Sequence, residues 1–163
     1  MDKRLLLRQL RKMFISGLHC AEWFFVYCVF KVTYETSLYF YSDRWVAVDI
    51  GFVVDASSNV SPEMWRNFKD IVKRTVDRYH VAPSSANVGM VTYGVDAKML
   101  FNFNDKIPNN YEVKRVVDKS PLVRGIPRLD RGLLMASRSL FTEENGMRRW
   151  VPKVRFVLSK STI

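Results

Sequence analysis

The segment Val46–Val54 constrains the fold of this chain more than any other feature. It is a nearly continuous apolar run, broken only by Asp49 and Gly51, and it is rich in β-branched side chains. Such a run is typical of a strand that is buried on both faces, as in a parallel sheet. The run ends at Asp55, where a polar loop begins. We therefore expect a central strand with a candidate site at its carboxyl end.

A helix is predicted directly after this loop. Ser61 can cap it, Pro62 suits the first helical position, and Glu63 suits the positive end of the helix dipole. Apolar side chains then recur at helical spacing, at Met64, Phe68, Ile71, Val72, Val76 and Tyr79. The pattern indicates an amphipathic helix that covers one face of a sheet.

Strands and helices alternate along the rest of the chain. Strands are predicted over Val88–Tyr93, Ala97–Phe101 and Val154–Leu158, and helices over Tyr111–Val117 and Leu129–Phe141. The short link Gly94–Asp96 predicts a hairpin, and hence one antiparallel edge strand. In the last helix we expect one shared face, made of Leu129, Leu133, Ala136 and Leu140. The alternation predicts a doubly wound, mostly parallel α/β sheet.

The loop after the central strand carries the candidate site. In doubly wound sheets, ligands bind beyond the carboxyl ends of the strands. Asp55, Ser57 and Asn59 place a carboxylate and two neutral oxygen side chains at alternate positions of this loop. Hard cations such as Mg²⁺ bind oxygen ligands and keep several waters, so few protein ligands suffice. The loop is therefore a candidate divalent-cation site.

Other kinds of site lack support in the sequence. The turn after the strand has no G-x-G-x-x-G pattern, and no phosphate-binding P-loop occurs. No nucleophile elbow or catalytic triad is suggested, and His19 and His80 have no metal-ligand spacing around them. Cys20 and Cys28 either form a disulfide or remain buried thiols. We expect a protein that is not an enzyme.

Three motifs give the chain a family resemblance. The strand Asp49–Ser57, the segment Asn87–Gly94 and the pair Phe103-Asn104 resemble a von Willebrand factor type A domain, in the form found in matrilins, collagen VI and integrin inserted domains. The resemblance extends over about Val48–Leu158. It implies a three-layer α/β/α fold with a metal-ion-dependent adhesion site.

In that family the adhesion site uses Asp-x-Ser-x-Ser, a threonine in a later loop, and an aspartate after the fourth strand. Asp55 and Ser57 match, and Asn59 replaces the second serine but keeps an oxygen. Pro127 takes the threonine position and Lys160 takes the aspartate position. The resemblance thus implies a degenerate site.

Lys160 is the basis of a hypothesis about the lost cation. Two unit charges about 4 Å apart interact by roughly 4 kcal/mol at an effective dielectric near 20. Lys160 would repel Mg²⁺ but attract Asp55, so we expect an Asp55–Lys160 pair and no cofactor. The alternative is weak Mg²⁺ binding through Asp55, Ser57 and Asn59. Asn59-Val60-Ser61 is also an N-glycosylation sequon, and a glycan there would cover the site.

Two regions are expected along the chain, an extension over residues 1–45 and a partial type A domain over residues 46–163. The extension starts basic and then becomes apolar from Met13 to about Val32, which is the pattern of a signal peptide or signal anchor. Glu22 opposes insertion into a bilayer. The alternatives are a hydrophobic helix or strand that packs on the domain, and a segment that does not belong to the domain. We expect a sheet that is incomplete at the C-terminus, with Val154–Leu158 as an exposed edge. Val32–Val46 is strand-prone and is a candidate to cover that edge.

The net charge of the chain indicates which kinds of binding partner to expect. The formal net charge is +10, but no block of like charges marks a nucleic-acid-binding tail, so nucleic acid is not the expected partner. A basic surface favours acidic partners such as sulfated glycans. The leading interpretation is a secreted or signal-anchored module that binds extracellular matrix or cell-surface proteins. The alternative is an intracellular type A domain in a nucleic-acid-binding or chaperone-like assembly.

Overall fold

A five-stranded mixed sheet in the order β1-β5-β2-β3-β4 forms the centre of the computed structural model. The structure describes residues 25–31, 47–105, 107 and 109–160. The strands are β1 (Phe25–Lys31), β2 (Val48–Asp55), β3 (Ala86–Tyr93), β4 (Ala97–Phe101) and β5 (Lys153–Ser159). β2 is parallel to both β3 and β5, which confirms the central parallel strand that its apolar run predicts.

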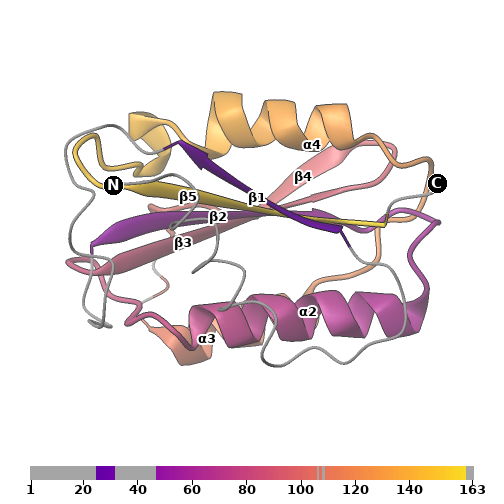
Figure 1. Cartoon of the computed structure of the whole chain (residues 1–163), viewed down its shortest axis with the longest axis horizontal. Coiled ribbons are helices and arrows are strands. Elements are labelled where there is room, and N and C mark those ends of the chain that lie inside the picture. The colour runs from indigo at the N-terminus through magenta and orange to yellow at the C-terminus, as the bar shows by residue number, and fades with distance from the viewer. Residues whose placement is uncertain (1–24, 32–46, 106, 108, 161–163) are drawn as a thin grey trace, which may run out of the picture.

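Helices lie on both faces of this sheet, which gives three layers (Figure 1). On one face lie α2 (Pro62–Val76) and α3 (Asn110–Lys119). On the other lies α4 (Leu129–Met135), which continues as the π-helical turn η1 (Ala136–Leu140); the 3-10 turn η2 (Glu143–Asn145) follows. The predicted three-layer α/β/α fold is confirmed.

The larger part of the core lies between the sheet and the α2–α3 layer. Helix α2 begins as predicted, because the Ser61 side chain accepts a hydrogen bond from the Met64 backbone N–H at 3.1 Å. Its buried residues are Met64, Trp65, Phe68, Val72 and Val76. They pack against the apolar side chains that β2 and β5 direct to this face, among them Phe52 and Phe156, whose rings stack at 5.3 Å.

The α4 layer packs more closely on the sheet than its apolar pattern predicts. Gly132 is buried, and a Cβ atom there would lie 2.8 Å from the Tyr93 ring. Leu129 and Leu133 are each 36% exposed, so their expected place on one face with the buried Ala136 and Leu140 is wrong. The helix turns its glycine to the sheet because the Tyr93 ring already fills the space beneath it.

An antiparallel strand lies at each edge of the sheet. The hairpin β3–β4 is the one that the short Gly94–Asp96 link predicts. At the other edge β1 pairs with β5 from Phe25 opposite Ser159 to Lys31 opposite Lys153. The expectation that β5 is an exposed edge is therefore wrong, because a strand from the N-terminal extension covers it.

The remaining predictions for the extension lie outside the described residues. They concern the basic start, most of the apolar stretch, and the strand-prone segment over residues 32–46. Within the part of the chain that the structure describes, no helix is both long enough and apolar enough to cross a membrane.

Candidate functional site

Asp55 lies at the carboxyl end of β2, with its side chain fully buried. One carboxylate oxygen, Oδ1, accepts a hydrogen bond from the Ser57 backbone N–H at 2.9 Å. The other, Oδ2, is buried without any hydrogen-bond partner. Leaving a buried charged oxygen unpaired is costly, so Oδ2 is the point of this site at which a cation or a hydrogen-bond donor would be most stabilised.

The loop that follows brings a second oxygen into the site. Ser57 is buried, and its Oγ accepts a hydrogen bond from the Asn59 backbone N–H at 3.3 Å. The Asn59 side chain is exposed. Exposure suits a glycan acceptor, and the glycan at Asn59 stays a prediction.

Two further oxygen side chains flank Asp55 that sequence reasoning did not select. Tyr93 is the register partner of Asp55 on β3, and Ser159 follows Leu158, the partner of Val54 on β5. Neighbours in register on parallel strands direct their side chains to the same face. Tyr93, Asp55 and Ser159 therefore form a row across the sheet, on its α4 side.

The Tyr93 hydroxyl is buried, and neither it nor Asp55 Oδ2 makes a hydrogen bond of regular geometry, although the Asp55 and Ser159 side chains lie near enough to act on the Tyr93 pKa. Burial raises the pKa of Tyr93 above its ordinary value; the Ser159 hydroxyl opposes this rise and the Asp55 carboxylate adds to it. The phenol thus stays protonated at physiological pH. It is a neutral oxygen beside the carboxylate. To find it from the sequence, one would need to know which residue of β3 lies opposite Asp55.

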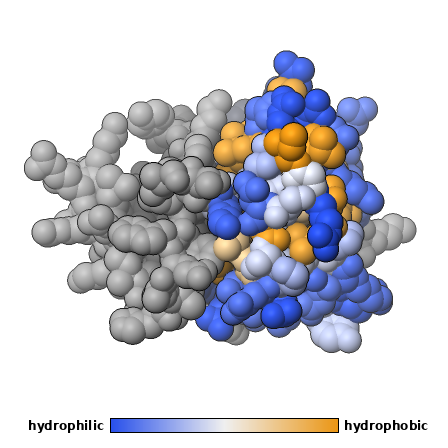
Figure 2. Space-filling model, turned by 90° about the vertical axis from the view of Figure 1, so that its right-hand side faces the viewer, coloured by the Kyte–Doolittle hydropathy of each residue, from blue (hydrophilic) through white to orange (hydrophobic). Residues whose placement is uncertain are grey.

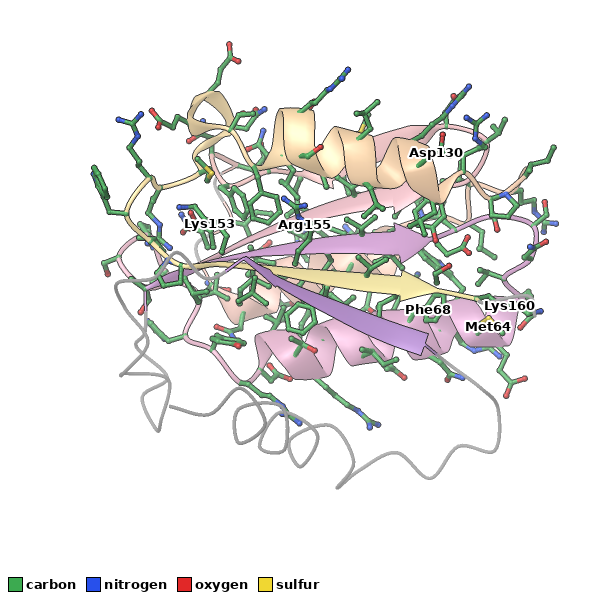
Figure 3. The ribbon with its side chains drawn as sticks, turned by 45° about the horizontal axis from the view of Figure 1, so that its top comes forward. Met64, Phe68, Asp130, Lys153, Arg155 and Lys160 are labelled. Carbon is green, nitrogen blue, oxygen red and sulfur yellow. The ribbon has the colours of Figure 1, made fainter. Side chains whose placement is uncertain are left out.

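Pro127 and Lys160 add no ligand to this row. Pro127 lies half-buried in the loop before α4 and has no side-chain oxygen. Lys160 is exposed (Figure 3), and no ion pair between described residues joins it to Asp55. Side chains alternate along a strand, so with Ser159 on the face of Asp55, Lys160 points away from it. The Asp55–Lys160 pair is not formed in this structure.

A second loop is fixed against the Asp55 loop. The Ser58 backbone N–H donates to the Gly125 carbonyl at 2.9 Å, and the Gly125 N–H donates to Ser58 Oγ at 2.8 Å. The Arg124 N–H donates to the Ala56 carbonyl at 2.7 Å. Arg124 has a φ of 64° and Gly125 a φ of 81°, and this left-handed pair makes the turn that allows these contacts.

Apolar side chains are exposed on this second loop and beside it. Ile126 is 72% exposed and Val95 49% exposed. A Cβ atom at Gly125 would lie 2.9 Å from Val95 Cβ, so the loop and the β3–β4 turn are in close contact. Figure 2 looks onto this end of the molecule, where hydrophobic side chains stand among hydrophilic ones. We call Asp55–Asn59, Val95 and Val123–Arg128 the carboxyl-end face.

The residues present fit a divalent cation only in part. Asp55 Oδ2 and Ser57 Oγ are two suitable oxygens, and the Tyr93 and Ser159 hydroxyls lie in the same row. Among the described residues, no three histidine, cysteine, aspartate or glutamate side chains gather into a metal-binding group. A single carboxylate with hydroxyl neighbours makes a weak site for Mg²⁺.

Comparison with known proteins decides the family. The family model "von Willebrand factor type A domain" matches residues 49–162. This chain belongs to the von Willebrand factor type A domain family. The match begins at Asp49, one residue after the start of β2, and includes the whole carboxyl-end face.

Individual type A domain proteins are similar over about the same region. Human von Willebrand factor A domain-containing protein 2 is 28% identical over 116 residues, which are 71% of this chain and 15% of that protein. Chicken matrilin-1 is 28% identical over 113 residues, 69% of this chain and 23% of that protein. Mouse vitrin is 24% identical over 111 residues, 68% of this chain and 17% of that protein. The chain thus spans less than a quarter of each relative.

A solved structure supports the same fold. Proximal thread matrix protein 1 from the mussel byssus, described with a zinc-occupied MIDAS motif, superposes with a TM-score of 0.60 at 25% identity. The superposition covers 77% of this chain and 28% of that one. That protein's MIDAS motif therefore holds a metal ion, whereas the metal content of the Asp55 loop in the present chain stays a prediction.

Proposed function

We propose that this chain carries a non-enzymatic protein-binding module of the extracellular matrix or the cell surface. Its type A family membership and its similarity to matrilin-1 and vitrin support an adhesion or protein-binding role. The proposed location is extracellular, by secretion or through a signal anchor. The partners are matrix or cell-surface proteins.

The carboxyl-end face is the observation that carries this proposal. Most large apolar side chains of a soluble domain are at least partly buried, whereas Ile126 and Val95 are 72% and 49% exposed on adjoining loops. Backbone hydrogen bonds hold the Ile126 loop, so the apolar surface is preorganised and little entropy is lost on binding. Exposed apolar groups on rigid loops are typical of protein-binding surfaces.

In this proposal the adhesion site is degenerate, and the module binds its partner without a tightly held cation. Where family members complete the ligand set with a threonine and an aspartate, Pro127 and Lys160 supply no ligand. Asp55 and Ser57 would hold a cation only weakly. Contact through Val95 and Ile126 would then supply most of the affinity, because burial of apolar surface is the main source of stabilisation.

Binding to purified matrix proteins tests the proposal. We expect the chain to bind at least one of immobilised collagen VI, fibronectin and laminin equally in Mg²⁺ and in EDTA. Ile126→Asp should weaken that binding about tenfold, since it places an unpaired charge at the contact. Tyr111→Asp is the matched control, because Tyr111 is 69% exposed on α3, away from this face. Binding to none of the three, or equal binding by the Ile126→Asp variant, would refute the proposal.

A further inference from the structure

A second surface lies at the opposite end of the sheet, where β5 begins. From Gly146 to Ile163 the sequence has five basic residues and no acidic one. Four of the five lie within Arg148–Arg155, around an exposed tryptophan. Short stretches rich in lysine and arginine are typical of surfaces that bind polyanions. We call Arg149, Trp150, Lys153 and Arg155 the basic–aromatic surface.

Trp150 is the most exposed large hydrophobic side chain in the described part of the protein, at 87%. The Arg149 guanidinium lies over its ring, 6.0 Å from the centroid, and Arg149 is itself largely exposed. An indole loses a large favourable burial energy when it stays in water. Its exposure beside a cation therefore indicates a ligand that carries negative charge and also has a ring that can stack on the indole.

Lys153 and Arg155 extend this surface along β5. They are two residues apart and therefore point to the same face. Val154 and Phe156 point into the core on the α2 side, so Lys153 and Arg155 point to the α4 side, as Figure 3 shows. Lys153 Nζ donates to the Arg149 carbonyl at 2.7 Å, which joins the strand to the tryptophan loop.

These cations are poorly compensated by carboxylates. Arg148 is fully engaged with the buried Asp49, and Arg149 makes an exposed pair with Glu143 at 3.2 Å. Within the described residues, neither Lys153 nor Arg155 forms an ion pair; the Arg155 guanidinium instead lies 4.6 Å from the Phe141 ring centroid.

The local charge at this end is therefore positive. Four cations (Arg148, Arg149, Lys153 and Arg155) against Asp49, Glu143 and Glu144 leave 4 − 3 = +1. Burial lowers the pKa of Lys153 and of Arg155, since each cation has lost part of its hydration. A bound anion would restore that lost stabilisation.

We propose that the basic–aromatic surface binds a sulfated glycan. Sulfate groups would pair with Arg149, Lys153 and Arg155, while the C–H face of a sugar ring would stack on Trp150. Single-stranded nucleic acid offers a similar combination of charge and rings. We favour the glycan because the similar proteins include a matrix protein and the proposed location is extracellular. The choice of a glycan thus rests on the proposed extracellular function, but the surface is separate from the carboxyl-end face, so variants at one surface do not affect the test of the other.

Heparin binding by the full chain tests this inference. Surface plasmon resonance with immobilised heparin should show binding that weakens between 50 mM and 300 mM NaCl, because ion pairs form the contact. Trp150→Ala should weaken binding about tenfold, and Lys153→Gln with Arg155→Gln about fivefold. Heparin from which the sulfate groups have been removed should lose most of the binding.

Matched controls distinguish binding at the basic–aromatic surface from attraction of heparin by the positive charge of the whole protein. Tyr111→Ala removes another exposed aromatic residue, and Arg66→Gln with Arg74→Gln removes two exposed cations from α2; each should change the affinity less than twofold. Because Lys153 and Arg155 are both half-buried, Arg149→Gln with Trp150→Ala is a second test on exposed positions only. The inference is overturned by no heparin binding, by equal losses in the controls, or by unchanged binding after desulfation. Tighter binding of a single-stranded oligonucleotide through these residues would replace the glycan with nucleic acid.

Discussion

An Arg148→Ala variant is expected to lose about 3–5 kcal/mol of unfolding free energy, since the change leaves a buried charge without its partner. Asp49 is fully buried at the start of β2. The Arg148 backbone N–H donates to its Oδ2 at 2.7 Å, and Arg148 Nε donates to its Oδ1 at 2.9 Å. The guanidinium also donates to the carbonyls of Val48 and Ser85, at 3.0 and 2.8 Å. One side chain thus ties the segment before β5 to β2 and to the residue before β3.

The pH dependence of this variant gives a second readout. Burial raises the pKa of Asp49, and the hydrogen bonds from Arg148 oppose that rise. Without Arg148 the pKa of Asp49 in the folded state rises further. In the folded variant Asp49 is then protonated at pH values at which it is ionised in the unfolded chain. Its stability therefore increases as the pH falls from 7 toward about 4, and its deficit is largest at neutral pH.

Urea denaturation at several pH values measures both effects. Adding Asp49→Asn to Arg148→Ala removes the buried charge and should recover part of the loss at neutral pH. Arg148→Lys should fail to recover it, because an ammonium group cannot reproduce the planar set of donors. A loss below about 1 kcal/mol at pH 7, a typical value for an exposed ion pair, would contradict the assignment.

Gly94→Ala is expected to cost about 2–3 kcal/mol, and its effect falls on the carboxyl-end face. A Cβ atom at Gly94 would lie 2.1 Å from the Arg124 carbonyl oxygen, far inside van der Waals contact. That oxygen belongs to the backbone, so relief requires the loop carrying Ile126 to move away. The Arg128 N–H, which donates to the Gly94 carbonyl at 3.0 Å, should lose this bond as well.

Amide hydrogen exchange shows which part of the Gly94→Ala variant is destabilised. In Gly94→Ala we expect faster exchange at the Arg124 and Ser58 amides, with protection in the centre of β2 unchanged. Ser58→Ala is the matched control, because it removes a single side-chain hydrogen bond to this loop and adds no atoms; about 1 kcal/mol is expected. Unchanged exchange at both amides in Gly94→Ala would show that the loop is not held by this contact.

Much of the fold can be predicted because its signals are local. The apolar run of β2, the cap at Ser61 and the short β3–β4 link each act within a few residues, and the structure confirms all three. The wrong face of α4 has a longer-range cause. Leu129 and Leu133 match a helical apolar pattern, but Gly132 is the residue that fits over the Tyr93 ring, which comes from another strand.

The site shows the same division between local and long-range information. Asp55 and Ser57 follow from one loop, and the structure places both at the carboxyl end of β2. Tyr93 and Ser159 look like ordinary strand residues, and only the register of β3 and β5 places them beside Asp55. The expected Asp55–Lys160 pair is not formed, because adjacent residues along a strand point to opposite faces and Ser159 already faces the Asp55 side.

Titration calorimetry of the chain with Mg²⁺ and Mn²⁺ most directly tests the central claim, that the carboxyl-end face binds its partner without a tightly held cation. With one buried carboxylate oxygen free and no ligand from Pro127 or Lys160, we predict no binding tighter than about millimolar. Asp55→Ala should then leave the titration unchanged. Micromolar binding of either ion, abolished by Asp55→Ala, would contradict the account and restore a working metal-dependent adhesion site.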